Sequence, residues 1–481
     1  MLTCAPQTPA ANDDDRVANH PPWTAASGLD ELRKTQYARL DDLGHTYLDW
    51  AAGALYAAGQ VRDHLRLLNG HVFGSPNAQG PASQAATALA SRTRACVLSF
   101  FNAAPDDYAV IFTANATGAL RLVGEAYPFM PEGHLLLCAD NHNSVNGIRE
   151  FARARGAPVS CAPLEDRELR INETALRSAL VLARGRGPSL FAYPAQSNFT
   201  GVQHSLAWIQ EAHDQGWDVL LDAAAFVPCH RLDLSRWHPD FVALSFYKMF
   251  GYPTGVGCLL ARRNKLAKLR RPAFAGGTVA TASVAGDWHV TARHEAAYED
   301  GTVNYLSLPA VEFGLRYLAG VGIDTVHARV VGLTGNLLAT LQSMRHGNGA
   351  PLVRIYGPGT AVARGAIVAF NILAPDGHVV DERRVDRRAA NASISLRTGL
   401  FSNPGAGEAA FAIARERLCD LARNPPANRD AYVAATGIAS GGAVRVSFGL
   451  ASNAADVRHL VAFVASFRDP APGSARLPPR V

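Results

Sequence analysis

Long apolar segments are missing from this sequence of 481 residues. No apolar run approaches the roughly 20 residues that cross a bilayer, so a membrane-spanning segment is not expected. The first 15 residues also lack an apolar core of signal-peptide length, and they include three consecutive aspartates at 13–15. These absences favour a cytoplasmic protein with no membrane partner.

Cysteine is scarce and follows no pattern. The chain has seven cysteines, an odd number, and no two of them have the C-x-x-C spacing of metal ligands. We therefore expect no metal site. Most of the cysteines have apolar neighbours and are expected to be reduced thiols in the core, including Cys419 in a helical stretch. The seven are Cys4, Cys96, Cys138, Cys161, Cys229, Cys258 and Cys419.

Charged residues are also few, at 18% of the chain, and the net charge of +5 is spread over the whole length. A dense Lys/Arg block with interleaved aromatic residues is absent, so nucleic-acid binding is not expected. With 48% hydrophobic residues, the composition is that of an ordinary soluble globular protein.

What the chain does contain, from Tyr47 onward, is an alternation of apolar strand candidates and alanine-rich helices. This alternation predicts an α/β fold with a mostly parallel central sheet and helices on both faces. Ligands of such sheets bind at the carboxyl ends of the strands. The strand candidates are Ala109–Thr113, Leu135–Cys138, Ser189–Tyr193, Val219–Asp222, Phe241–Ser245 and Gly257–Ala261.

The sequence divides into four predicted segments. Residues 1–27 are rich in Ala, Pro, Asn and Asp and are expected to be a flexible arm. Residues 28–319 form the large domain, and residues 320–468 form a smaller C-terminal α/β domain. Residues 469–481, rich in Pro, Gly and Arg, are expected to be a flexible tail.

Helices are predicted near the start of both domains. An amphipathic helix is expected over Leu29–Leu40. A long helix is expected over Val326–Ser343, with Asp324 or Thr325 as its cap. Strands at Ala366–Ile372 and Ala443–Phe448 are expected to follow in the smaller domain.

Lys248 is the most informative residue. It follows the buried strand Phe241–Leu244 and precedes a glycine-rich turn. Loss of hydration beside such a strand lowers the pKa of a lysine, and a neutral amine forms Schiff bases. When this motif is considered alone, a surface lysine after a core strand is the simpler interpretation. A second apolar strand ending in Asp222 favours the cofactor pyridoxal phosphate, since a lysine holds its aldehyde and an aspartate keeps its pyridine nitrogen protonated.

Other polar residues follow strands in the same region. Thr117 lies where a strand turns into a helix, an arrangement that binds anions but also occurs in an ordinary capped turn. His142 could stack on a flat cofactor or be a structural hydrogen-bonder. Asn198 could donate to a phenolic oxygen or belong to a turn beside Gly201.

Three further residues have two readings each. Ser245 could bind phosphate or cap its strand, and Thr278 could bind phosphate or belong to a plain glycine turn. Arg445 lies within a strand, where it could bind the carboxylate of an amino-acid substrate or form an internal salt bridge.

In their order along the chain, these motifs resemble the class V aminotransferase family, which includes the cysteine desulfurases. The resemblance is closest to the desulfurase-like domain of molybdenum cofactor sulfurases and covers roughly residues 28–455. The matching stretches are Leu29–Asp41, Tyr47–Asp49, Phe73–Asn77, Asn141–Glu150, Asp240–Gly257, Ala275–Ala280, Glu299–Ser307 and Leu396–Gly399.

The resemblance implies a fold type I pyridoxal-phosphate enzyme that forms a homodimer. Lys248 would hold the cofactor, Asp222 would pair with its pyridine nitrogen and His142 would stack on its ring. The phosphate would be bound by Thr117, Ser245 and Thr278, the last reaching in from the other subunit. Asn198 would contact the cofactor, and Arg445 and Arg397 would bind the substrate carboxylate.

The chain departs from the sulfurases in the loop after Arg397. The sulfurase loop resembles R-T-G-C-F-C-N-P-G-A-C-E, and its last cysteine takes up sulfur. Here the three cysteine positions are Leu400, Ser402 and Gly407. Because only a thiolate can accept sulfur as a persulfide, transfer by this route is in doubt. Two pocket positions also differ, Trp50 in place of histidine and Ala225 in place of glutamine or lysine.

A carbon–sulfur or other β-eliminating lyase that acts on a cysteine-like or sulfoxide substrate is the expected activity. An enzyme without the loop cysteine can still eliminate a leaving group from Cβ, with Lys248 as the base for the α-proton. Transamination shares the first step and is the alternative, and racemisation comes third. A non-catalytic scaffold is disfavoured by the joint presence of Lys248, Asp222, His142 and Arg445. A sulfurase that uses Cys419 or Cys229 instead is a further possibility.

Overall fold

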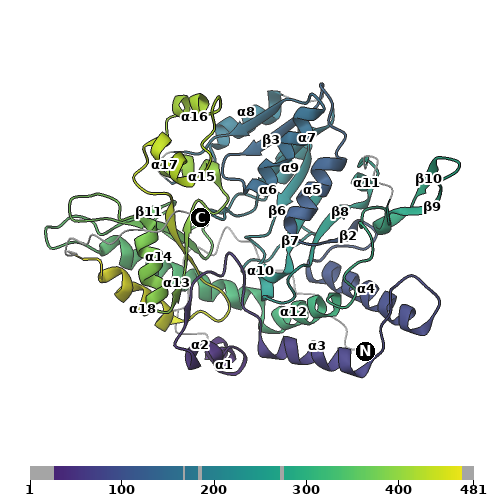
Figure 1. Ribbon diagram of the computed structural model, residues 1–481, viewed down its shortest axis with the longest axis horizontal. Helices are drawn as coiled ribbons and strands as arrows, with labels where there is room; N and C mark the ends of the chain where they lie inside the picture. The colour runs from purple at the N-terminus through teal and green to yellow at the C-terminus, as the bar shows by residue number, and fades with distance from the viewer. Residues whose placement is uncertain (1–26, 166–167, 183–186, 271–275, 469–481) are drawn as a thin grey trace.

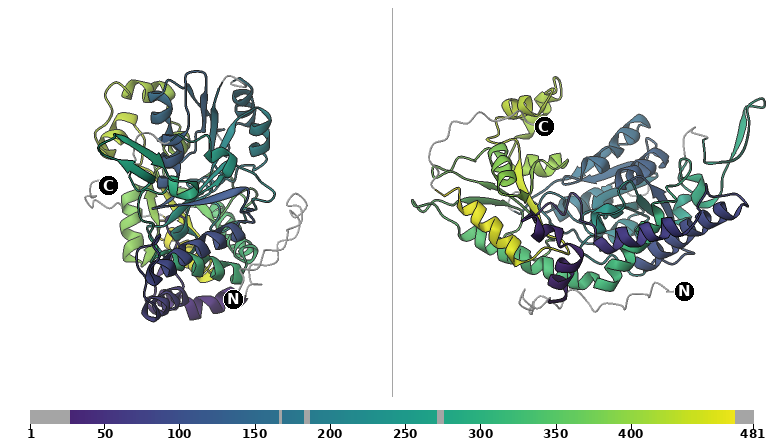
Figure 2. Two further views of the ribbon diagram at one scale, coloured as in Figure 1. Left: turned by 90° about the vertical axis from the view of Figure 1, so that its right-hand side faces the viewer. Right: turned by 60° about the horizontal axis from the view of Figure 1, so that its bottom comes forward.

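The computed structural model describes residues 27–165, 168–182, 187–270 and 276–468, which form two main sheets with helices packed around them (Figures 1 and 2). Most of the predicted arm (1–26) and the predicted tail from residue 469 lie outside the described residues. Among the helices within these ranges, none combines the length and the apolarity needed to cross a membrane.

The larger sheet has seven strands in the order β2-β8-β7-β6-β5-β3-β4. Strand β8 runs antiparallel to both of its neighbours, and the other pairings in this sheet are parallel. The prediction of a mostly parallel sheet is therefore confirmed. The strands are β2 (Tyr108–Thr113), β3 (His134–Cys138), β4 (Val159–Ala162), β5 (Ser189–Pro194), β6 (Asp218–Asp222), β7 (Phe241–Ser245) and β8 (Gly257–Arg262).

Helices cover both faces of this sheet because successive side chains of a strand point to opposite faces. Phe241 and Ala243 of β7 belong to the core formed with helices α5 (Ala116–Ala126) and α7 (Ile148–Ala154). Val242 and Leu244 belong to the core on the other face. That second core includes side chains of α4 (Pro81–Phe100), α9 (Trp208–Asp214) and α12 (Leu308–Val321).

The smaller sheet is antiparallel, with the strand order β11-β12-β15-β14. Its strands are β11 (Val353–Tyr356), β12 (Ile367–Ile372), β14 (Arg397–Gly399) and β15 (Ala443–Ser447). Helices α13 (Ile323–Ser343), α14 (Glu382–Asn391) and α18 (Ala454–Ala465) pack beside it (Figure 1). The division of the chain at residues 319 and 320 stays a prediction.

The N-terminal segment is bound to the smaller sheet. Strand β1 (Thr46–Tyr47) pairs in parallel with β13 (Ile394–Ser395), and Asp49 forms a bridge with Ser447. This pairing places residues 46–50 beside β14 and β15. The single helix predicted over Leu29–Leu40 is wrong, because the structure has two helices there, α1 (Ser27–Gln36) and α2 (Arg39–Asp42).

Two further expectations are corrected. Helix α13 begins at Ile323 after Gly322, whose φ of 86° favours glycine, so neither Asp324 nor Thr325 is the cap. Cys419 is exposed on α16 (Arg415–Leu421), a helix with no buried residue, so it is not a core thiol. The remaining elements are α3 (Ala58–Gly70), α6 (Asn143–Asn146), α8 (Glu173–Leu182), α10 (Phe246–Phe250), α11 (Arg263–Leu266), β9 (Val279–Ser283), β10 (Trp288–Thr291), η3 (His294–Ala297), α15 (Pro404–Ala410) and α17 (Arg429–Thr436).

Candidate active site

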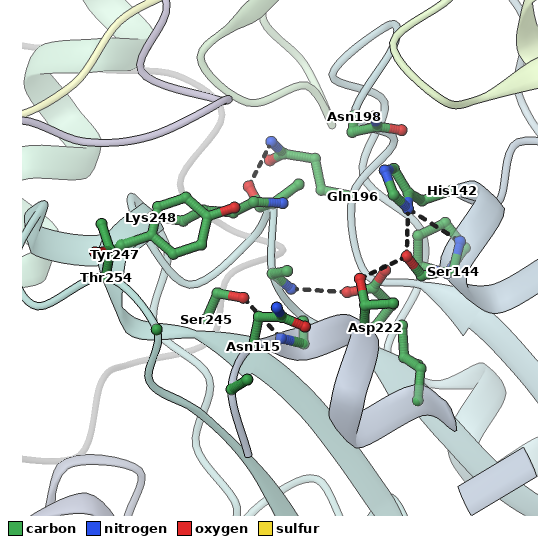
Figure 3. Close-up of a pocket in the computed structure, with 18 residues that line it drawn as sticks. Asn115, His142, Ser144, Gln196, Asn198, Asp222, Ser245, Tyr247, Lys248 and Thr254 are labelled. Carbon is green, nitrogen blue, oxygen red and sulfur yellow. Dashed lines mark hydrogen bonds between the residues drawn. The ribbon is translucent and has the colours of Figure 1, made fainter. Parts of the chain in front are cut away.

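A cavity of about 300 Å³ lies at the carboxyl ends of β5, β6 and β7, beside the N-terminus of α5 (Figure 3). This is the edge at which ligands bind in open α/β sheets, and the volume is at the small end of the range of roughly 300–1,000 Å³ typical of small-molecule sites. Six of the predicted site residues line it, namely Thr117, His142, Asn198, Asp222, Ser245 and Lys248.

Lys248 lies on α10, a single turn of helix that follows β7 directly. Gly251 ends this turn with a φ of 79°, and a Cβ there would meet the backbone of Tyr56 at 2.4 Å, so only glycine fits. Burial lowers the pKa of Lys248, and the positive charge of Arg445 lowers it further, whereas Asp222 acts in the opposite direction. A larger fraction of neutral amine follows, as the sequence predicted.

Asp222 is the last residue of β6, and its side chain is buried with the carboxylate directed into the cavity (Figure 3). Its Oδ1 accepts a hydrogen bond of 3.0 Å from the backbone N–H of Ala224. The carboxylate therefore has a fixed orientation, and it acts electrostatically on both Lys248 and His142.

His142 is the N-cap residue of α6, and its Nδ1 accepts a hydrogen bond of 3.1 Å from the backbone N–H of Ser144. Burial lowers the pKa of this imidazole; Asp222 raises it, and Lys248 and Arg445 lower it. This lowered pKa favours the neutral ring, as does the hydrogen bond that Nδ1 accepts. The hydroxyl of Ser144 links His142 to Thr117, at 3.0 Å from Nδ1 and 2.8 Å from the Thr117 Oγ1.

The cavity wall nearest to α5 is made of small polar groups. Asn115 caps this helix of 11 residues, and Ser245 Oγ accepts a hydrogen bond of 2.8 Å from the N–H of Ala116. Gly257 of β8 approaches the same turn so closely that a Cβ would lie 2.7 Å from the backbone of Asn115. The positive end of a helix dipole and several hydroxyls thus face one end of the cavity, which suits an anion.

Two arginines lie beside the cavity and share one carboxylate. Asp49 receives hydrogen bonds from Arg397, at 3.0 Å from Nε and 2.6 Å from Nη2, and from Arg445 Nη2 at 3.3 Å. The salt bridge considered as the alternative role of Arg445 is therefore present. Arg445 also donates to the carbonyl oxygen of Asn198 at 2.9 Å, and burial lowers its pKa to about 10.

The loop between β14 and α15 is fastened to the cavity rim. Asn198 Nδ2 donates to the carbonyl oxygen of Phe401 at 2.7 Å, and its Oδ1 accepts from Asn403 Nδ2 at 2.9 Å. Arg445 lies over the Phe401 ring, 4.6 Å from its centroid. At Gly407, a Cβ would lie 2.6 Å from Cδ2 of Leu400, so Leu400 fills the space of any side chain there.

Comparison with known proteins then decides the family. The profile of the family Aminotransferase class-V matches residues 46–460. The chain belongs to the class V aminotransferase family. The molybdenum cofactor sulfurase of Arabidopsis thaliana is 35% identical over 481 residues, covering 92% of this chain and 58% of that protein. The chain thus spans little more than half the length of this relative.

Solved structures share the fold of this chain. The apo cysteine desulfurase of Thermococcus onnurineus NA1 superposes with a TM-score of 0.75 at 20% identity, covering 91% of this chain and 97% of that one. The cystine C–S lyase C-DES, solved with its product cysteine persulfide, superposes with a TM-score of 0.67 at 17% identity, covering 90% of this chain and all of the other. The predicted fold type I architecture is confirmed.

Pyridoxal phosphate, the cofactor of the class V aminotransferase family, fits the groups present in this cavity. Lys248 supplies a desolvated amine, and Asp222 supplies a buried, oriented carboxylate. The N-terminus of α5 with Thr117 and Ser245 presents backbone N–H groups and hydroxyls of the kind that suit a phosphate. Lysine, aspartate and a helix N-terminus are the donor set that an aldehyde, a pyridine nitrogen and a phosphate require.

The sequence did not single out every residue of this site. Gln196 lines the cavity and donates to the Ala225 carbonyl at 2.9 Å, and Ser144 and Asp49 were not singled out as site residues. Asp49 was part of a matching stretch, but nothing in the sequence signals that it meets two arginines about 350 and 400 positions away. Thr278 lies at the base of the β9–β10 hairpin and does not line the cavity described within this chain.

Proposed function

We propose that this chain is a pyridoxal-phosphate-dependent lyase that cleaves the carbon–sulfur bond of a cysteine-like amino acid. The observation that carries the proposal is the convergence of Lys248, Asp222 and His142 on one cavity. The resemblance to the sulfurases adds that Gly407 of α15, not a cysteine, stands at the position expected to accept sulfur. The solved lyase and desulfurase relatives support the same reaction class.

When bound, pyridoxal phosphate supplies an electron sink for the pair left at Cα. Asp222 holds a proton at the pyridine nitrogen. Arg445 and Arg397 would bind the substrate carboxylate, and the Lys248 amine would remove the α-proton. The Cβ–S bond then breaks, with its electron pair leaving on sulfur. For L-cysteine and one water molecule, the products are pyruvate, ammonium and hydrogen sulfide, so the reaction needs no oxidant or reductant.

An absorption experiment tests this proposal. The purified protein, loaded with pyridoxal phosphate, is expected to show a visible band that Lys248→Ala abolishes. Addition of L-cysteine should then release pyruvate and ammonia in equal amounts. Conversion of the cofactor to its pyridoxamine form without ammonia would show an aminotransferase instead, and a protein that never shows the band would be a scaffold.

The cysteines that the structure describes do not favour a sulfur acceptor from elsewhere in the chain that would replace the loop cysteine. Cys229 is buried, and burial raises its pKa to about 12, so it is a poor source of thiolate. Mass spectrometry after feeding with L-cysteine is expected to show no persulfide on Cys229 or on the exposed Cys419, and a persulfide on either would identify a sulfurase.

The six cysteines of the described ranges are free, which supports a reducing cytoplasmic location.

We further propose a homodimer, with Thr278 completing the phosphate site of the partner. The β9–β10 hairpin projects from the body of the molecule (Figure 1), and Val284, Trp288 and Val290 expose apolar surface on it. Such surface on an extended arm suits contact with a second copy. Light scattering should give about twice the chain mass of 51.2 kDa, and Trp288→Asp should reduce it toward the monomer. A monomeric wild-type protein would contradict the proposal.

A further inference from the structure

We infer that Asp49 is a positioning residue for the substrate carboxylate: it holds Arg397 and Arg445 as a pair whose remaining charge binds an α-amino acid. This inference rests on the proposed function, since it concerns how the same site selects its substrate. It rests on the strand register and the hydrogen bonds around Asp49.

Arg397 and Arg445 are direct cross-strand partners in the register of β14 and β15. Residues opposite each other on antiparallel strands have Cβ atoms about 4.5–5.5 Å apart, and like charges in that position repel. Arg445 is buried, so its charge is poorly screened by water. Without a counter-ion, this pair of guanidinium groups would move apart or destabilise the sheet.

Asp49 supplies that counter-ion from a distant part of the chain. Its carboxylate is buried, and it accepts hydrogen bonds from both guanidinium groups. Its backbone is fixed as well, because the β1–β13 pairing and the bridge to Ser447 anchor the segment beside β14 and β15. The Tyr47 hydroxyl adds a hydrogen bond of 2.8 Å to the Gly53 carbonyl across the turn.

One carboxylate between two guanidinium groups leaves one unit of positive charge at the edge of the cavity. Arg397 is half exposed, and Nε of Arg445 has no hydrogen-bond partner among the residues that the structure describes. Donor capacity therefore remains for a second carboxylate, and bidentate recognition by arginine is the geometry that a carboxylate prefers. Asp49 itself repels such a ligand, so it acts through the arginines.

The test compares two ligands that differ only in the carboxylate, L-alanine and ethylamine. Neither carries a leaving group on Cβ, so their effect on the visible band of the pyridoxal-phosphate-loaded protein reports binding without elimination. Asp49→Asn is expected to raise the apparent Kd for L-alanine about tenfold, as expected for a weakened charge-assisted contact, and to change that for ethylamine less than twofold.

Asp456→Asn is the matched control. Like Asp49, Asp456 is buried and accepts a hydrogen bond from a buried arginine, at 2.7 Å from Arg33, but it belongs to α18 and its arginine is not one of the pair beside the cavity. This variant should lower Tm and leave both apparent Kd values unchanged. Asp49→Glu, which keeps the charge but displaces it, serves if Asp49→Asn does not fold, and it should still weaken L-alanine selectively.

Equal weakening of L-alanine and ethylamine in the Asp49 variants, or no weakening of either, would overturn the inference. The failure of the proposed function looks different. A wild-type band that responds to neither ligand would show that the site does not bind amino acids, and both the function and the inference would then be wrong.

Discussion

His230 is a buried imidazole that the proposed chemistry does not use. Its Nδ1–H donates to the carbonyl oxygen of Phe226 at 3.3 Å, while Nε2 receives a hydrogen bond from Gln203. This arrangement requires the neutral ring. Burial and the neighbouring His327 hold the pKa of His230 well below its usual value of 6.5.

A consequence for stability at low pH follows from this residue. Above pH 6.5 the ring is neutral whether the protein is folded or unfolded, so it adds no pH dependence. Below pH 6.5 the unfolded chain binds a proton that the folded ring does not, and stability falls by up to about 1.4 kcal/mol per pH unit. Urea unfolding between pH 7 and 5 should give a shallower decline for His230→Gln than for the wild type, and parallel curves would contradict this account.

At the scale of single elements, the rim loop between β14 and α15 packs closely against α15, since Leu400 of the loop lies beside Gly407 of the helix. Leu400 occupies the space that a side chain at 407 would need. We expect Gly407→Cys alone to cost about 1–3 kcal/mol, the usual cost of overpacking, and Leu400→Cys combined with it to recover most of that loss. Thermal unfolding of both variants measures this, and equal Tm values for the single and double variants would show that Leu400 is not the obstacle.

Sequence patterns predicted best the elements whose apolar residues must be buried. All six strands predicted for the large sheet are present in the structure, because each is a short apolar run followed by a turn. The residues at or just after the ends of these strands, Asp222 and Lys248 among them, lie together at one edge of the sheet. The sequence did not predict the break between α1 and α2, because the spacing of the apolar residues there is compatible with one helix or with two.

Residues whose environment depends on distant segments could not be predicted. Cys419 lies in a helical stretch and was expected in the core, yet none of the residues of α16 is buried. Asp49 gained a role only through the register of β14 against β15, which no local pattern encodes. The start of α13 depended on a left-handed backbone at Gly322, where a side-chain cap was expected at Asp324 or Thr325.

At the scale of the whole molecule, the first described helix is held against the last. Arg33 of α1 is buried, and it donates to Asp456 of α18 at 2.7 Å and to the Ala451 carbonyl at 2.8 Å. Arg33→Ala would leave the Asp456 carboxylate buried without its partner, and we expect a loss of about 3–5 kcal/mol in the free energy of unfolding. Lys34→Ala, at an exposed pair with Glu31, should change it by less than about 0.5 kcal/mol. Denaturant titration of both variants measures the difference.

The two halves of the candidate site are completed at different times during synthesis. The groups proposed to hold the cofactor lie between residues 115 and 248, whereas the arginine pair and its counter-ion combine residue 49 with residues 397 and 445. A ribosome has therefore translated every proposed cofactor-binding group of the cavity almost 200 residues before the last arginine exists. A nascent chain at that stage could meet its cofactor, but it would have no means to distinguish an amino acid from a simple amine.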